Sequence, residues 1–218
     1  MTQNITEAIE EVNLIKKVID RTQNDFSRIA DFFAAVGVIN AITYLLYAVM
    51  FQALSRMEQV GYSLWMIFRR LNYVAIVGYI VLFLIYRGKL KRRNNDLSLS
   101  LINIWGVLLI GGEAFRMLFS ILNFEQRDVY FYQRTLTFVF PIIGCFVLGF
   151  IIQDSLIRWV TAAVVALYVV LAGTGLEICV GRLHGNNVNI GLDMLLTAAV
   201  MSVGMIALGI YLRGKGER

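Results

Sequence analysis

Glu113 and Arg116 are the residues whose types and spacing are best suited to chemistry, because they interrupt a long apolar run in the motif IGGEAFRMLF. Residues three apart share one face of a helix, so this carboxylate and guanidinium are placed to form an ion pair. Ionisable side chains are costly inside apolar spans and often mark a functional site. A purely structural pair fits the same spacing, and both interpretations stay open.

More polar residues occur between Glu177 and Asp193, where the motif GRLHGNN predicts a turn. We expect Glu177 to close one apolar helix and Asp193 to open the next, at the same level as Glu113. Such an arrangement predicts an outward-facing polar pocket that binds a ligand or holds a buried ion pair. Its candidate residues are Glu113, Arg116, Glu177, Arg182, His184 and Asp193.

The sequence has no motif of a known catalytic or metal site, such as HExxH, GxSxG or a phosphate-binding loop. His184 is the single histidine, and neither cysteine has a second cysteine or a histidine at metal-ligand spacing. We therefore expect no catalytic residues, no metal and no cofactor. An intramembrane enzyme is the least favoured functional class.

The composition indicates the class of structure that must hold these residues in place. The chain has 218 residues, of which 58% are hydrophobic and 16% are charged, whereas soluble domains are about 45–50% apolar and about 25% charged. A helix needs about 20 apolar residues to cross a bilayer. Six runs approach or exceed this length, which predicts an all-α, polytopic integral membrane protein with a bundle of six transmembrane helices. The runs cover residues 32–54, 71–86, 97–122, 135–152, 157–179 and 188–212.

The distribution of Lys and Arg predicts the orientation of these spans. Six spans place both termini on one side, and short cytoplasmic loops are enriched in Lys and Arg. With the termini inside, thirteen of the 20 basic residues are cytoplasmic, six are outside and Arg116 lies within a span. The motif RGKLKRRNN contributes most to this bias. We therefore expect a multi-pass protein of the cell membrane with both termini in the cytoplasm, in contact with the lipid bilayer and not with nucleic acid.

Residues 1–31 form a distinct polar segment ahead of the six-span domain at 32–218. Apolar residues recur there every three or four positions within about 160° of arc, which predicts an amphipathic helix. The segment has six acidic and four basic residues, whereas helices that lie on lipid are usually rich in Lys and Arg. We expect Ile9, Val12 and Ile19 to contact a protein partner or a second copy of the chain. A lipid-surface helix and a solvated, fraying helix are the alternatives.

Two functional hypotheses follow. The N-terminal helix favours an integral membrane sensor, regulatory or assembly subunit that docks on a protein partner. The polar residues expected on the outer side favour a binding or transport subunit that captures a small solute from that side. The apolar inner half contradicts a complete pump, because it offers no polar path across the membrane.

Overall fold

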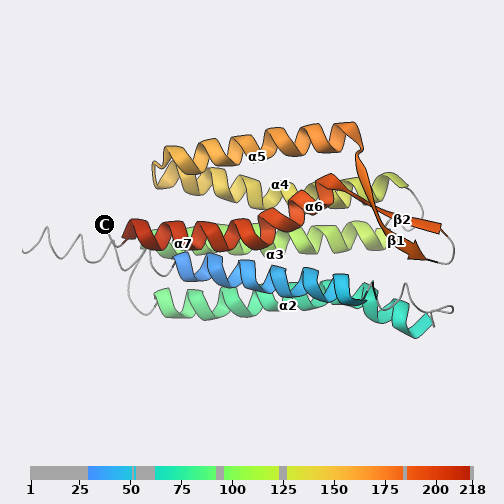
Figure 1. Ribbon diagram of the computed structural model, residues 1–218. Helices are drawn as coiled ribbons and strands as arrows, with labels where there is room; N and C mark the ends of the chain where they lie inside the picture. Colours follow the sequence, from blue (N-terminus) through green and yellow to red (C-terminus); the bar gives the residue numbers. More distant parts are fainter. Residues whose placement is uncertain are drawn as a thin grey trace, which may run out of the picture.

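The computed structural model describes residues 29–50, 52, 62–91, 96–122, 127–183 and 186–216, most of which are helical. The long helices lie side by side along one axis (Figure 1). The first helix covers Ile29–Met50. It is followed by α2 (Tyr62–Lys91), α3 (Asp96–Leu122), α4 (Arg127–Ile151) and α5 (Ser155–Thr174).

Five helices of the described part are long and apolar enough to cross a membrane, namely Ile29–Met50, Tyr73–Lys91, Ser98–Leu118, Ser155–Thr174 and Leu192–Lys215. The apolar part of α4, Thr135–Ile151, is shorter. The outer faces of these helices carry large exposed apolar side chains, such as Trp159 on α5 and Val107 on α3. A surface of this kind fits hydrocarbon and not water. The chain is therefore a multi-pass helical membrane protein, as its composition predicts.

The connection after α5 contains two strands that the sequence patterns did not predict. Strands β1 (Glu177–Leu183) and β2 (Asn186–Gly191) form an antiparallel hairpin, which extends past the end of the helices (Figure 1). Helix α5 ends at Thr174 because Gly175 adopts a left-handed φ of 60°, which glycine tolerates. The fifth apolar run thus leaves the helix before Glu177. The all-α expectation holds for the bundle but omits this hairpin.

The last span contains a local change of helix type. Helix α6 (Leu192–Ala199) continues through a π-helical turn, η1 (Val200–Gly204), into α7 (Met205–Gly216). The hydroxyl of Ser202 donates to the carbonyl of Ala198 at 2.6 Å within this turn. π-Helical turns are rare and are frequent at functional sites. The apolar periodicity of the sequence did not predict it.

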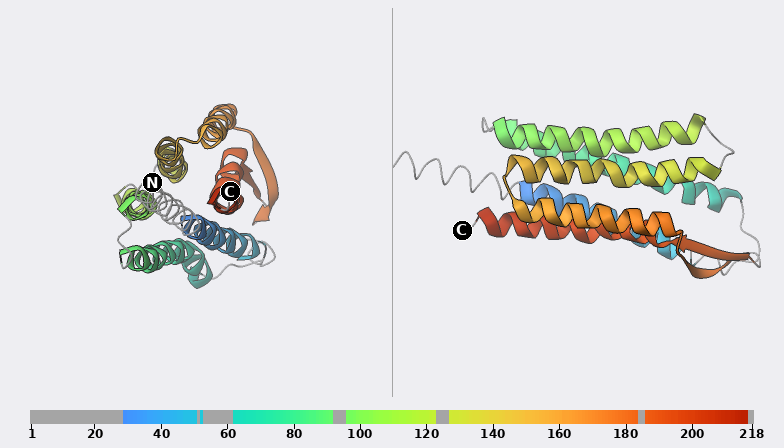
Figure 2. Two further views of the ribbon diagram at one scale, coloured as in Figure 1. Left: turned by 90° about the vertical axis from the view of Figure 1, so that its left-hand side faces the viewer. Right: turned by 90° about the horizontal axis from the view of Figure 1, so that it is seen from above.

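The first helix lies between α2 and the last span (Figure 2). Phe33 packs edge-on against Trp105 of α3 with ring centroids 4.7 Å apart. A Cβ added at Gly37 would lie 2.7 Å from the carbonyl oxygen of Ser202, so the backbones of the first and last spans are in direct contact. Gly209 makes a similar contact with the backbone of Ala30. Small residues at this crossing allow the close approach, as expected for helices packed in a membrane.

Candidate functional site

The ion pair expected on α3 is present. Arg116 donates from Nε to Glu113 Oε2 at 2.7 Å, and its Nη2 lies 2.6 Å from the same oxygen. The exposed fractions of the Arg116 and Glu113 side chains are 19% and 13%. Both partners lie one turn apart on a single helix, so the pair forms without help from another element. Its contribution to function depends on what the neighbouring helices place around it.

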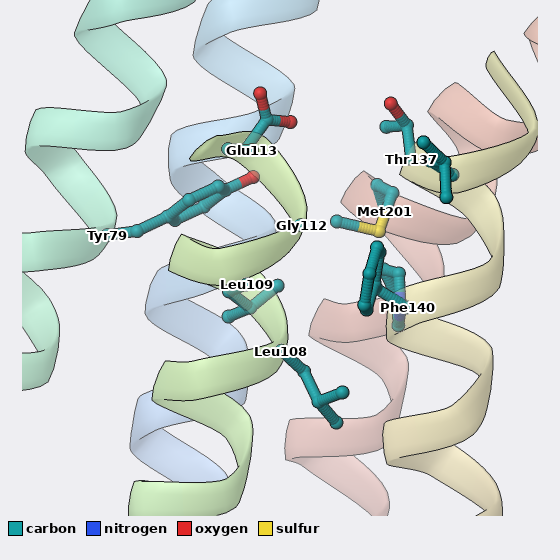
Figure 3. Close-up of a pocket in the computed structure, with 10 residues that line it drawn as sticks. Tyr79, Leu108, Leu109, Gly112, Glu113, Thr137, Phe140 and Met201 are labelled. Carbon is teal, nitrogen blue, oxygen red and sulfur yellow. The ribbon is translucent and has the colours of Figure 1, made fainter. Parts of the chain in front are cut away.

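A hydrogen bond between two other helices lies close to this pair. The hydroxyl of Tyr79 on α2 donates to Asn40 Oδ1 on the first helix at 2.6 Å. Asn40 Nδ2 in turn donates to the carbonyl of Val36 at 2.9 Å. Both side chains are buried, and buried polar groups are costly unless they are paired. The bond therefore joins the first helix to α2 and also fixes the phenol ring of Tyr79 beside Glu113 (Figure 3).

Two tyrosines of the first helix also lie near the charges. Tyr44 and Tyr47 each lie close enough to interact electrostatically with both Glu113 and Arg116. We call the whole set the polar cluster. It consists of Asn40, Tyr44 and Tyr47 from the first helix, Tyr79 from α2, and Glu113 and Arg116 from α3. Three helices thus contribute polar side chains around one pair of opposite charges.

A narrow cleft adjoins the polar cluster on the side of α4 and the last span (Figure 3). Tyr79, Glu113, Phe140, Pro141 and Met201 belong to its lining. The space has room for about one water molecule. The cleft as it stands therefore excludes any solute much larger than water.

Two irregular helix segments border this cleft. Pro141 lies inside α4, where it cannot donate the backbone hydrogen bond that another residue would supply. Met201 belongs to the π-helical turn η1. The cleft thus lies between the two places where the helices that form it depart from regular α-helical hydrogen bonding.

Of the other residues predicted for the pocket, the structure describes Glu177 and Arg182 in β1 and Asp193 in α6. Glu177 is exposed and is the first residue of β1, whereas Asp193 is buried in the first turn of α6. Within the described residues, neither forms an ion pair with Glu113 or Arg116. Arg182 stands opposite Asn187 in the hairpin. His184 lies outside the described residues. A shared pocket for these residues and Glu113 therefore stays a prediction.

The residues predicted for partner binding, Ile9, Val12 and Ile19, also lie outside the described part of the chain. The first described helix begins at Ile29. The amphipathic helix expected for residues 1–31 thus stays a prediction as well.

A second set of charged residues lies at the end of the bundle opposite the hairpin. It links the turn between α4 and α5 to the end of α7. Asp154 caps α5, because its Oδ1 accepts from the amides of Leu156 and Ile157. Its Oδ2 accepts from the hydroxyl of Tyr211 at 2.8 Å and from Lys215 Nζ at 2.6 Å. The carboxylate thus connects the turn between α4 and α5 to α7.

Hydrogen bonding decides the ionisation of Asp154. Burial raises the pKa of this carboxyl, but the hydrogen bonds from Lys215, Tyr211 and the Ile157 amide outweigh burial and lower the pKa to about 2. Asp154 is therefore ionised at neutral pH. A second ion pair at this end, between Arg213 and Asp31, joins α7 to the first helix.

The chemistry available to the polar cluster is binding and charge placement. No group of three or more His, Cys, Asp or Glu side chains within the described ranges is placed to hold a metal ion. The phenol and amide groups of the cluster were missed at the sequence level. One signal was present, because Asn40, Tyr44 and Tyr47 recur at four and three residues and so share one face of a helix.

Comparisons with protein-family models, curated proteins and solved structures found no match to this chain. A helical bundle alone does not specify a function. The features that bear on function are the polar cluster and the first helix, which carries three of its six residues.

Proposed function

We propose that the protein is a sensor, regulatory or assembly subunit of the cell membrane that docks on a protein partner through its N-terminal helix. In this proposal the chain crosses the membrane six times, with α4 as the fourth span and both termini in the cytoplasm. The observation that supports it is the attachment of the polar cluster to the first helix. That helix follows directly on the N-terminal segment in the chain.

The first helix has contacts near its start and near its middle. Near its start, Asp31 pairs with Arg213 of α7. Asn40, about 14 Å further along the axis at 1.5 Å per residue, accepts the hydrogen bond from Tyr79. A helix held at two levels moves largely as a rigid body. A change around Glu113 and Arg116 would therefore be carried towards the segment that precedes Ile29.

The small size of the cleft favours this relay over transport. A transporter needs a passage or paired broken helices at the substrate site, and the cleft beside Glu113 has room for about one water molecule. A sensor or regulatory subunit needs only two arrangements of the same helices with a small difference in free energy.

The docking step is tested by replacing Ile9, Val12 and Ile19 together with Ser. The matched control replaces Glu10, Lys17 and Asn24 with Ser, which leaves the net charge unchanged and lies on the opposite face of the expected helix. Light scattering of the solubilised complex measures its mass. We expect the complex to dissociate in the apolar-face variant and to persist in the control. A complex of unchanged mass in both variants contradicts the proposal.

The orientation is tested separately by labelling. In a background without Cys145 and Cys179, Asn95→Cys should react with an impermeant thiol reagent only after permeabilisation. Asn187→Cys should react in intact cells. Labelling of both positions from the same side contradicts the six-span orientation.

A second candidate is an outward-facing subunit that captures a small solute. The cleft favours it, because Glu113 lines it together with Pro141 and Met201 of the π-helical turn, and helices can rearrange at lower cost at such irregular positions. The test is Thr137→Cys in the same cysteine-free background, with Leu148→Cys as a buried control. Reaction at 137 but not at 148 in intact cells supports an outward-opening cleft. No reaction at either position contradicts it.

A further inference from the structure

The last span changes its neighbours along its length. At the level of η1 it touches the first helix, since a Cβ added at Gly37 would lie 2.7 Å from the carbonyl oxygen of Ser202. Towards the hairpin, α6 bends away from the first helix and packs on α4 and α5 (Figure 1). There Leu196 packs against a second apolar cluster, which consists of Phe138, Ile142 and Tyr168. The two helices that touch at η1 therefore diverge beyond it.

Two apolar faces lack a covering helix, within the described part of the chain, where these helices diverge. Positions seven or eight apart share one side of a helix, so Leu195 continues the side of Ser202 and Leu45 continues that of Gly37. Ser202 is only 8% exposed, whereas Leu195 is 41% and Leu45 is 65% exposed. At 1.5 Å per residue, Leu195 lies about 10.5 Å beyond Ser202 and Leu45 about 12 Å beyond Gly37. The two exposed leucines are therefore at one level of the bundle.

The π-helical turn lies at the point of divergence and has the properties of a hinge. Sharp bends of helices occur at π-helical turns and where a side chain bonds to the backbone of the preceding turn. Both features are present, because Ser202 of η1 donates its hydroxyl to the carbonyl of Ala198 at 2.6 Å. In a bilayer, an apolar helix face is nearly as stable against lipid as against another helix. Two positions of α6 can therefore be close in free energy.

We propose that η1 is a hinge about which α6 exchanges between two positions. The first is the position in the structure, against α4 and α5. In the second, α6 continues along the half of the first helix nearer the hairpin, with Leu195 against Leu45. The second position buries both of the apolar faces that the first leaves exposed, and it gives up the contact of Leu196 with the second apolar cluster.

The hinge borders the cleft beside the polar cluster. Met201 of η1 and Glu113 both line this cleft, so a change of η1 alters the space next to the ion pair. The exchange thereby supplies the second arrangement of helices that a sensor or regulatory subunit requires. It rests on the proposed function for its biological role, whereas the motion itself does not depend on docking by the N-terminal segment.

The test is disulfide trapping in the full chain, in lipid vesicles and in a cysteine-free background. Leu45→Cys/Leu195→Cys should form a disulfide under mild oxidation, because α6 reaches the first helix in its second position. Gly112→Cys/Phe140→Cys is the positive control, since a Cβ added at Gly112 would lie 3.3 Å from that of Phe140, close to the separation in a disulfide. Leu45→Cys/Val169→Cys is the negative control, because Val169 is exposed on α5.

A second change shifts the balance between the two positions. Leu196→Ala weakens the contact of α6 with the second apolar cluster and should speed formation of the 45–195 disulfide about tenfold. Met194→Ala, at an exposed position of the same helix, should leave the rate unchanged.

Three results overturn the hinge. They are a missing 45–195 disulfide where the 112–140 disulfide forms, a 45–169 disulfide that forms as fast, and equal rates in Leu196→Ala and Met194→Ala. None of these results bears on docking, which is measured by the mass of the complex. The hinge and the proposed function can therefore fail separately.

Discussion

The crossing of the first and last spans at Gly37 offers a direct test of how the bundle is packed. Replacing Gly37 with Ala adds one methyl group where two helix backbones touch. The new Cβ would lie 2.7 Å from the carbonyl oxygen of Ser202 and 2.8 Å from the amide nitrogen of Ile206. Both are backbone atoms, so a change of side-chain rotamer cannot relieve the contact.

The geometry sets the size of the effect. Ordinary contacts of a Cβ begin near 3.4 Å, so the two helices must separate by about 0.7 Å or bend at the π-helical turn. Overpacking of this kind costs about 1–3 kcal/mol. Ala is itself better than Gly in a helix by about 1 kcal/mol, which offsets part of the cost. We expect a net loss of about 1 kcal/mol in the free energy of unfolding.

Gly111→Ala is the matched control, because nothing lies within 4 Å of a Cβ added there. It keeps the gain in helix propensity without the clash, so it should be neutral or slightly stabilising. The measurement is reversible unfolding in mixed micelles by added dodecyl sulfate, followed by circular dichroism. We expect the two variants to differ by about 2 kcal/mol. Equal stabilities would refute the inferred backbone contact at Gly37.

Three further predictions concern the polar groups. The pKa of Asp154, lowered from its ordinary value of 3.8 to about 2, means that its carboxylate stabilises the fold above pH 4. About 2 kcal/mol should be lost as the pH falls towards 2, and Asp154→Asn should flatten this part of an unfolding–pH profile. Tyr79→Phe leaves Asn40 Oδ1 without its donor and should destabilise by about 1 kcal/mol; Asn40→Leu/Tyr79→Phe should recover most of this loss in the same unfolding assay, and additive losses would contradict the bond. Glu113→Gln leaves Arg116 without its counter-ion and should cost about 3–5 kcal/mol. Glu113→Leu/Arg116→Leu should restore thermal stability, and its failure to do so would show that the two residues do not act as a pair.

Several features of the structure could be predicted from short-range patterns in the sequence. Runs of about 20 apolar residues predict membrane helices, because an inserted segment must satisfy its own backbone hydrogen bonds. The spacing of Glu113 and Arg116 predicts their ion pair for a similarly local reason, since positions three apart share a helix face. The structure has this pair, with Arg116 Nη2 2.6 Å from Glu113 Oε2.

Local pattern was less informative where helices end or change type. The fifth apolar run continues past Thr174, but the left-handed conformation of Gly175 ends α5 there, and strand pairing places Glu177 opposite Gly191. Where the hairpin begins and ends depends on hydrogen bonds between two segments of the chain, which the pattern of one segment does not specify. The π-helical turn at Val200–Gly204 likewise has no signature in apolar periodicity.

The sequence by itself determined the class of protein and the residues that carry charge within it. Only the tertiary structure decided what surrounds that charge. Tyr79 lies 39 residues from Asn40 in the chain, and no spacing rule connects residues on separate helices. In a bilayer the apolar faces of helices are nearly equivalent to lipid, so hydropathy does not specify which faces meet. The close backbone contact at Gly37 and the buried bond between Tyr79 and Asn40 make that choice, and they place the first helix against Glu113.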